Sequence, residues 1–354
     1  MDNHNHLIQD NHGRRVNYLR ISVTDRCNFR CLYCVPPEGV SLLPREEILS
    51  YEEIMQVVKA AVGLGITRFR VTGGEPLSRP GIIGFLETLV KTPGVEYVSL
   101  TTNGSFLLCY HQQLNAIGLG GINVSLNSLK RQGFAELSGV DGFNRVWDGI
   151  NALIGNGFNN IKLNTVIMRG YNDGEIMDFV RLTVDRPLTV RFIEHMPCGV
   201  WQNDSYDSTV PSGEIMETIR TSGHLAPSPK SIGYGPARYY RFEDAQGLVG
   251  FISPVSEPFC ASCNRLRLTA DGRLKACLLS NDIVDVKSIL MANSPLAIHA
   301  YSGDACPRPL RRSGDEARRG QRNSQLPDAF IRAAMLKPAV HHNEELVVMS
   351  RIGG

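Results

Sequence analysis

The chain has 354 residues, of which 42% are hydrophobic, and its 37 Lys and Arg residues nearly balance 35 Asp and Glu residues. A net charge of +2 provides no polybasic field for a nucleic acid or a membrane surface, and no apolar run approaches the roughly 20 residues that cross a bilayer. The N-terminal residues are rich in His and Asn and lack the apolar core of a signal peptide. We therefore expect a cytoplasmic protein whose nine cysteines are metal ligands or buried thiols rather than disulfides.

Predicted strands and helices alternate over the first 221 residues. Apolar and β-branched runs predict strands at 17–23, 67–72, 95–101, 121–126, 160–168 and 188–194. Helical periodicity follows at 51–62, 80–91, 106–117, 143–155, 174–184 and 211–221, and Ser50 with Glu53 predicts a capping box at the start of the first helix. Strict alternation favours parallel strands with right-handed crossovers, and six units form an open, partial (βα)6 barrel similar to a TIM barrel. Such barrels carry their active sites at the C-terminal ends of the strands.

The pattern changes after residue 230. Short strands are predicted at 238–243, 247–253 and 266–270, and Asp271-Gly272 predicts a two-residue hairpin turn that sets Ala270 opposite Arg273. We expect a flexible leader at 1–13, the barrel at 14–230 and a smaller α+β domain at 231–354. Within that domain, residues 293–331 are rich in Pro and Arg and atypical, which indicates a loop or tail.

Three cysteines follow the first predicted strand with the spacing Cys27-x3-Cys31-x2-Cys34. Thiolates favour zinc or iron–sulfur centres. Three ligands leave one coordination position open for chemistry, and half of a structural zinc site is the alternative interpretation.

A second cluster comprises Cys260-x2-Cys263 and, thirteen residues later, Cys277. The predicted hairpin sets Leu266 opposite Cys277, which brings that thiol within reach of Cys263. The same strand carries Arg265 and Arg267 on one face beside the cluster. A zinc ribbon that lacks one ligand is the alternative for this site.

Polar residues gather at the C-terminal ends of the predicted barrel strands. The second strand ends in Gly73-Gly74-Glu75-Pro76, where paired glycines allow close approach of a ligand and a carboxylate can bind an amine. Other such residues are Thr101, Ser125 and the run Glu194-His195-Met196. Arg20, Arg70 and Lys162 join Arg265 and Arg267 as cations that suit a polyanion such as a triphosphate. No hydrolase motif stands out, and a thiolate-bound cluster with an open iron favours redox chemistry.

Residues 19–34, which read LRISVTDRCNFRCLYC, resemble the signature of radical S-adenosylmethionine (SAM) enzymes, and specifically of the GTP 3′,8-cyclase family of molybdenum cofactor biosynthesis. The resemblance continues at residues 70–77, 101–104, 161–164, 192–197, 259–269 and 352–354. It covers residues 14–290 and the last twenty. Residues 293–331 depart from the family, through either a compensated reading-frame excursion or a lineage-specific loop.

The resemblance implies a set of site residues. Cys27, Cys31 and Cys34 would hold a [4Fe–4S] cluster whose open iron binds SAM. The SAM site would be lined by Tyr33, Gly74, Glu75, Ser125 and Met196. A second [4Fe–4S] cluster would be held by Cys260, Cys263 and Cys277, and its open iron would meet guanine. GTP would be bound by Arg20, Arg70, Thr101, Lys162, Arg265 and Arg267, and the Gly353-Gly354 tail would reach the active site.

The implied reaction forms 3′,8-cyclo-7,8-dihydro-GTP after SAM cleavage to methionine and 5′-deoxyadenosine. The implied partners are GTP, a flavodoxin- or ferredoxin-like donor and, downstream, cyclic pyranopterin monophosphate synthase, and a homodimer is compatible with the sequence. Three alternatives stay open: a two-cluster radical SAM enzyme that modifies a peptide, a family member impaired by residues 293–331, and a zinc-stabilised binding protein.

Overall fold

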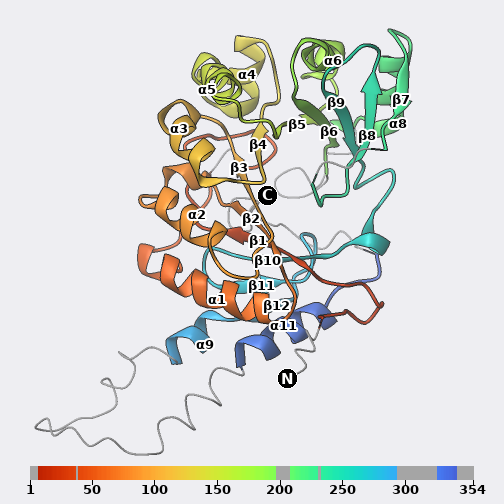
Figure 1. The fold of residues 1–354 in the computed structure, drawn as a ribbon. Coiled ribbons are helices and arrows are strands. Elements are labelled where there is room, and N and C mark those ends of the chain that lie inside the picture. Colours follow the sequence, from red (N-terminus) through yellow and green to blue (C-terminus); the bar gives the residue numbers. More distant parts are fainter. Residues whose placement is uncertain (1–6, 37–38, 197–207, 230–232, 293–324, 341–354) are drawn as a thin grey trace, which may run out of the picture.

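The computed structural model describes residues 7–36, 39–196, 208–229, 233–292 and 325–340 (Figure 1). One twelve-stranded sheet runs through it in the order β12-β11-β10-β1-β2-β3-β4-β5-β6-β9-β8-β7. In chain order the strands are β1 (Tyr18–Ser22), β2 (Arg68–Thr72), β3 (Tyr97–Thr102), β4 (Gly121–Ser125), β5 (Ile161–Ile167), β6 (Thr189–Glu194), β7 (Leu225–Pro227), β8 (Arg238–Phe242), β9 (Leu248–Ile252), β10 (Arg265–Leu268), β11 (Arg273–Lys275) and β12 (Ile283–Asp285).

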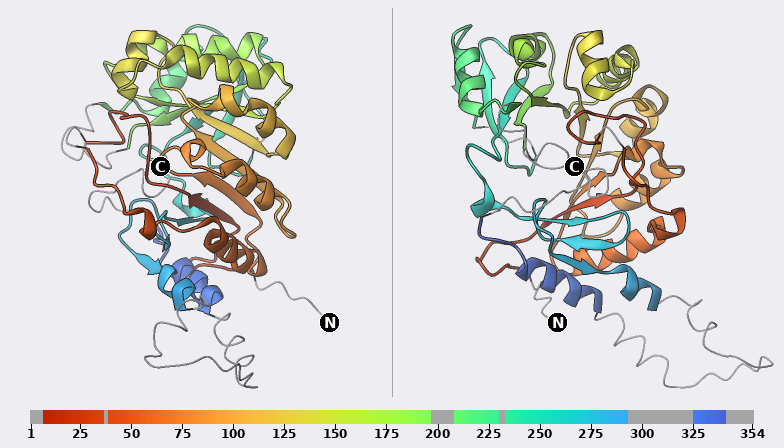
Figure 2. Two further views of the ribbon diagram at one scale, coloured as in Figure 1. Left: turned by 90° about the vertical axis from the view of Figure 1, so that its left-hand side faces the viewer. Right: turned by 180° about the vertical axis from the view of Figure 1, so that it is seen from behind.

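Helices cover the outer face of the curved sheet, as the views of Figures 1 and 2 agree. In chain order they are α1 (Tyr51–Gly63), α2 (Ile82–Val90), α3 (Leu107–Ile117), α4 (Arg131–Ser138), α5 (Phe143–Gly155), α6 (Ile176–Asp185), α8 (Ser212–Arg220), α9 (Lys287–Ala292) and α11 (Gln325–Met335). The six strand–helix units predicted from the sequence are confirmed. Helix α4 was not predicted, because it has only eight residues and a glycine interrupts it.

Strand periodicity separates the apolar core from the polar interior of the barrel. On β1, Leu19 and Ile21 are fully buried in the main hydrophobic core, while the alternate residue Arg20 lines the central pocket. The first helix begins as predicted. Ser50 Oγ accepts the Glu53 N–H at 3.1 Å, and the Glu53 carboxylate accepts the Ser50 N–H at 2.7 Å.

Strands from beyond residue 230 extend the barrel sheet at both sides. β9 pairs in parallel with β6, and β10 pairs in parallel with β1, which sets Arg267 beside Arg20. Eight neighbouring strands, from β10 through β1–β6 to β9, are therefore parallel, and antiparallel strands follow only at the two edges. The domain boundary at residue 230 stays a prediction. One sheet contains strands from both sides of that boundary.

The predicted register of the β10–β11 hairpin is wrong by one residue. Arg267 pairs with Lys275 rather than with Ala276, because the turn holds three residues instead of two. The Thr269 N–H donates to the Arg273 carbonyl at 2.9 Å, and Gly272 adopts the left-handed region with φ of +80°. If this register continued past the end of β11, Cys277 would fall opposite Arg265 instead of Leu266, and Cys263 and Cys277 line the same pocket.

Two terminal regions differ from expectation. In the predicted leader, Ile8 is buried and donates its N–H to the Leu64 carbonyl, so this part packs on the barrel. In the atypical segment 293–331, the last seven residues begin helix α11, whose apolar face packs against α1 and the β11–β12 edge. Residues 293–324 lie outside the described residues. Among the described helices, none combines the length and apolarity that a membrane crossing needs.

Candidate active site

The first cysteine loop follows β1 directly. Its backbone is tied to the end of α4, because the Arg30 and Leu32 N–H groups donate to the Ser138 and Leu137 carbonyls at 2.8 and 2.9 Å. Burial, together with the neighbouring thiols of Cys34 and Cys27, raises the pKa of Cys31. The three thiols therefore form one group whose charges affect one another.

The glycine pair after β2 fits under this loop. The Gly74 N–H donates to the Thr24 carbonyl at 2.7 Å, and a Cβ built on Gly74 would lie 2.1 Å from the Arg26 carbonyl oxygen. No other residue type can occupy this position without moving the backbone that leads into Cys27. The close approach of a ligand to the glycine pair stays a prediction, and the group that the structure places against Gly74 is the cysteine loop itself.

Glu75 is fully buried and does not line the pocket. Its carboxylate accepts the Asn103 N–H at 2.6 Å, the Thr102 hydroxyl at 2.8 Å and the Leu77 N–H at 2.9 Å. Burial raises the pKa of Glu75 to about 7, against the opposing effect of these donors. Its observed role is to join the turn after β2 to the end of β3.

The second cysteine set lies at the start of β10. Cys260 begins a 3-10 turn (Cys260–Ser262), and Cys260, Cys263 and Cys277 all line the central pocket. Burial raises the pKa of Cys263, but the charges of Arg265 and Lys337 outweigh it and bring the pKa to about 6. This site therefore favours a thiolate, the form that binds metals.

Both cysteine sets meet one small apolar cluster. Leu279 is its buried member, and Cys34 of the first set and Cys277 of the second pack against it together with Met196 and Leu278. Over the described residues, no three His, Cys, Asp or Glu side chains converge closely enough to hold a single metal ion.

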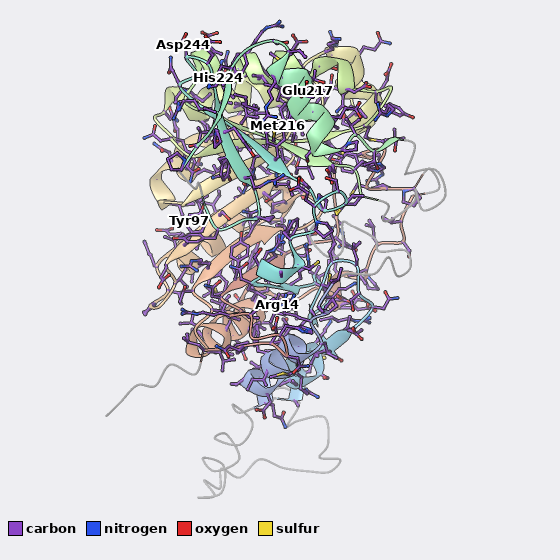
Figure 3. All side chains as sticks on the ribbon, turned by 90° about the vertical axis from the view of Figure 1, so that its right-hand side faces the viewer. Arg14, Tyr97, Met216, Glu217, His224 and Asp244 are labelled. Carbon is purple, nitrogen blue, oxygen red and sulfur yellow. The ribbon has the colours of Figure 1, made fainter. Side chains whose placement is uncertain are left out.

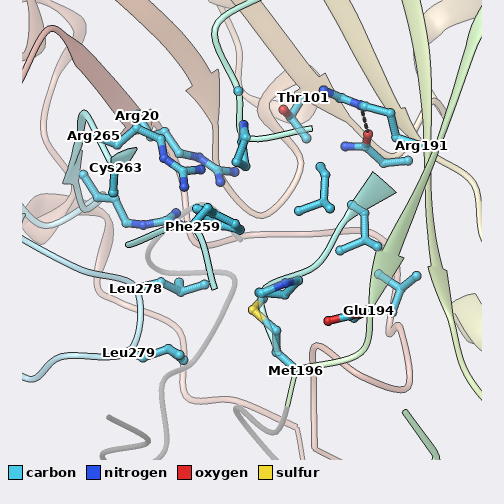
Figure 4. Close-up of a pocket in the computed structure, with 18 of the residues that line it drawn as sticks. Arg20, Thr101, Arg191, Glu194, Met196, Phe259, Cys263, Arg265, Leu278 and Leu279 are labelled. Atoms are coloured by element: carbon cyan, nitrogen blue, oxygen red, sulfur yellow. Dashed lines mark hydrogen bonds between the residues drawn. The ribbon is translucent and has the colours of Figure 1, made fainter. Parts of the chain in front are cut away.

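The central pocket collects cations. Five arginines line it, namely Arg20, Arg70, Arg191, Arg265 and Arg267. Figure 4 shows Arg20 and Arg265 on one side, Arg191 across from them and Met196 at the other end. Burial lowers the pKa of Arg191 and of Arg267 to about 10. Among the described lining residues Glu194 is the one carboxylate, and it accepts the N–H groups of Ser212, Val255 and Ser256.

The pocket also brings together several other predicted site residues. Tyr33, Thr101, Ser125 and Met196 line it, and the Tyr33 hydroxyl accepts a hydrogen bond from Asn127 at 2.9 Å. Lys162 is buried, and its ammonium contacts Asn160. The residues predicted for the site that do not line the pocket are Cys27, Cys31, Cys34, Gly74, Glu75 and Lys162. Gly353 and Gly354 lie outside the described residues.

Sequence reasoning missed Arg191. Its Nε donates to Asn164 Oδ1 at 2.9 Å and its Nη2 contacts Asn123 Oδ1, so the guanidinium is held across three strands (Figure 4). The signal that could have found it is its place on β6, two residues before Ile193 and therefore on the same inward face.

Two family models match the chain, the radical SAM superfamily at residues 21–183 and Molybdenum Cofactor Synthesis C at residues 188–303. A GTP 3′,8-cyclase of Moorella thermoacetica is 42% identical over 351 residues, which cover 98% of this chain and 100% of the relative. One of Geobacter sulfurreducens is 45% identical over 289 residues, which cover 82% of this chain and 88% of the relative. The chain belongs to the GTP 3′,8-cyclase family.

Membership of this radical SAM family implies a [4Fe–4S] cluster and SAM. The donors fit, since the first cysteine loop offers three neighbouring thiols beside Tyr33 and Met196. Among solved structures, Streptococcus suis SuiB bound to S-adenosylmethionine has a TM-score of 0.54 at 13% identity, with 82% of this chain and 67% of that chain covered. That likeness shows the shared radical SAM fold.

Proposed function

We propose that this chain converts GTP into 3′,8-cyclo-7,8-dihydro-GTP, the first step of molybdenum cofactor biosynthesis. The observation that carries the proposal is a single pocket lined by five arginines and by Cys260, Cys263 and Cys277, with Cys34 of the first cysteine set packed against its lining residue Leu279. A polyanionic substrate suits this lining, because five arginines face the pocket and Glu194 is the one carboxylate among the described lining residues. Family membership identifies the polyanion as GTP.

The SAM side of the pocket is formed by Tyr33, Ser125 and Met196, beside the loop of Cys27, Cys31 and Cys34. Cys27, Cys31 and Cys34 would hold the [4Fe–4S] cluster, which when bound would supply the electron for reductive cleavage of SAM. Gly74 and Glu75 act here as positioning residues, since the first lets the loop approach and the second holds the end of β3.

The GTP side is formed by arginines on neighbouring strands. Arg20 on β1, Arg70 on β2 and Arg267 on β10 lie at one level, because the register pairs Arg20 with both of the others. Arg191 lines the same pocket from β6, and the charges of Arg191 and Arg70 act on the buried Lys162. Their planar forks suit the bidentate binding of phosphate oxygens, and we assign the triphosphate to this group. Thr101 and Arg265 complete the nucleotide site.

The second cysteine set would hold a further [4Fe–4S] cluster at the opposite side of the pocket, facing the guanine. The lowered pKa of Cys263 and the five-arginine lining support an anionic iron–sulfur centre there. The reaction takes up two electrons and one proton for each GTP, because methionine and 5′-deoxyadenosine leave and the nucleotide product is an isomer of GTP. We therefore propose a flavodoxin- or ferredoxin-like electron donor. We also propose cyclic pyranopterin monophosphate synthase as the consumer of the product, a cytoplasmic location and a homodimer.

Anaerobic reconstitution with iron and sulfide, followed by SAM, dithionite and GTP, tests the proposal. We expect about eight irons per chain and a nucleotide isomeric with GTP, formed together with an equal amount of 5′-deoxyadenosine. Replacing Cys27, Cys31 and Cys34 by Ala should halve the iron and abolish both products. Zinc without sulfide, or 5′-deoxyadenosine without the isomeric nucleotide, would overturn the proposal.

A further inference from the structure

Lys337, just beyond helix α11, reaches the second cysteine set. Its side chain is almost fully buried, at 3% exposure. Its Nζ donates to Cys263 Sγ at 3.3 Å and to the Arg265 carbonyl at 2.9 Å. Both acceptors belong to the segment that opens β10, more than seventy residues away in sequence, and neither belongs to the helix that Lys337 follows.

Arg14, near the N-terminus, contacts both the segment before β10 and the residues after α11. Its Nη1 donates to the Cys260 carbonyl at 2.7 Å, and its Nη2 donates to the Pro338 carbonyl at 2.8 Å. An ion pair with the buried Asp10 at 2.6 Å fixes the guanidinium. Figure 3 shows Arg14 beside the C-terminal helix, at the opposite end of the molecule from Asp244. The Arg14 side chain therefore joins three segments: the N-terminal residues around Asp10, the turn at Cys260 and the residues after α11.

The packing of α11 places the residues after it next to the second cysteine set. The apolar face of the helix (Leu326, Ala329, Phe330, Ala333 and Ala334) is buried against α1 and the β11–β12 edge. Asn11 also donates to the Met335 carbonyl at 2.7 Å, at the last residue of the helix. These contacts of α11 thus position Lys337 next to Cys263.

A buried ammonium is costly unless charged or strong acceptors surround it. A neutral thiol is a weak acceptor, whereas a metal-bound thiolate is a good one. Hydrogen bonds and positive charge at the ligand sulfurs stabilise the reduced, more negative state of an iron–sulfur centre, and outer partners of ligands orient them. The contact between Lys337 and Cys263 has the geometry for both effects.

We propose that Lys337 and Arg14 are positioning residues of the Cys260–Cys263–Cys277 site, in which Lys337 sets the reduction potential through Cys263 and Arg14 fixes the backbone of Cys260. This inference rests on the second cluster proposed above.

The test uses the full chain with Cys27, Cys31 and Cys34 replaced by Ala, so that iron reports on the second site alone. In this parent we compare Lys337→Met, Lys337→Arg, Arg14→Gln and, as a control, Lys59→Met on the exposed face of α1. The readouts are iron per chain, the reduction potential by EPR-monitored titration, the rate of iron loss to a chelator, and the unfolding temperature of the iron-free protein.

We expect Lys337→Met to shift the potential to more negative values and to speed iron loss about 10-fold, whereas Lys337→Arg retains most of the parent potential. Arg14→Gln should speed iron loss with a smaller shift in potential, because Arg14 bonds the backbone rather than a sulfur. Lys59→Met should match the parent in every readout.

Two results would overturn the inference alone. The first is an iron-loaded parent whose potential and iron loss do not respond to Lys337→Met. The second is a change in potential and iron loss that comes with an equally large fall in the unfolding temperature of the iron-free protein. That result would mean that Lys337 has a purely structural role. An iron-free parent, by contrast, would overturn the second cluster itself and the inference with it.

Discussion

The Glu75 carboxylate accepts the backbone N–H of Asn103 at 2.6 Å, across two strands of the barrel. The Asn103 side chain in turn donates to Asn28 Oδ1 at 2.9 Å, one residue after Cys27. Glu75 also donates its own N–H to the Arg26 carbonyl at 2.7 Å. Glu75 thus supports the first cysteine loop, although its side chain does not line the pocket.

Replacing Glu75 by Gln should therefore damage the first cluster site. The carboxylate accepts three hydrogen bonds, and an amide group would present its own N–H groups to some of these donors, at a cost of about 1–3 kcal/mol per unsatisfied group. We expect a lower unfolding temperature and a loss of iron from the first site, measured by calorimetry and iron analysis. Glu87→Gln, at an exposed position on α2, is the control, and equal behaviour of the two variants would contradict this role.

Gly74→Ala should prevent the first loop from forming. The added Cβ would lie 2.1 Å from the Arg26 carbonyl oxygen and 2.9 Å from the Cys27 nitrogen, and both are backbone atoms that cannot turn away. Gly84→Ala on α2 is a matched control, because a Cβ there meets nothing within 4 Å and alanine favours the helix by about 1 kcal/mol. Iron per chain after reconstitution should fall by about half for Gly74→Ala only.

Much of this architecture could be predicted from the sequence, because its signals are local. Alternating apolar residues identified the six barrel strands, whereas the two three-ligand sites that cysteine spacing predicts stay predictions. The hairpin register was wrong, since the left-handed Gly272 serves a three-residue turn as readily as a two-residue one. The contact of Lys337 with Cys263 joins residues far apart in the chain, and no local pattern predicts it.

Arg191→Met should weaken GTP binding without altering the chemical step. Arg191 lies across the pocket from Arg20, and Arg70 also lines that pocket. Loss of a hydrogen-bonded charge costs about 1.5–3 kcal/mol, which corresponds to a roughly 10- to 100-fold higher KM. Steady-state kinetics at varied GTP should show this rise with kcat nearly constant. Arg181→Met, an exposed arginine paired with Asp178, is the control. A fall in kcat with an unchanged KM would contradict a binding role.

Lys162 should link stability and GTP binding to pH. Burial, followed by the charges of Arg191 and Arg70, lowers the pKa of Lys162 to about 6, whereas the unfolded chain keeps this proton up to a pH of about 10.4. Between these two values the unfolded state binds more protons, so the free energy of unfolding should rise with pH. Lys162→Met should reduce that slope, which denaturant titrations at several pH values measure.

Polyphosphate binding should restore the proton to Lys162. Since the ammonium is stabilised by a nearby anion, GTP binding near pH 8 should take up about one proton, and the affinity should fall as pH rises above about 6. Calorimetric titrations in two buffers of different ionisation enthalpy count this proton. The uptake should disappear in Lys162→Met, and an identical proton count in both proteins would show that Lys162 does not face the polyphosphate.

The dependence of SAM cleavage on the nucleotide tests the central claim most directly. The reconstituted chain is given SAM and dithionite under nitrogen, with GTP, with ATP or with neither, and 5′-deoxyadenosine is measured over time. We predict rapid formation with GTP and only slow background formation with ATP or without nucleotide, because the five-arginine pocket adjoins the SAM side. Equal rates in the three mixtures would contradict the assignment of that pocket to GTP.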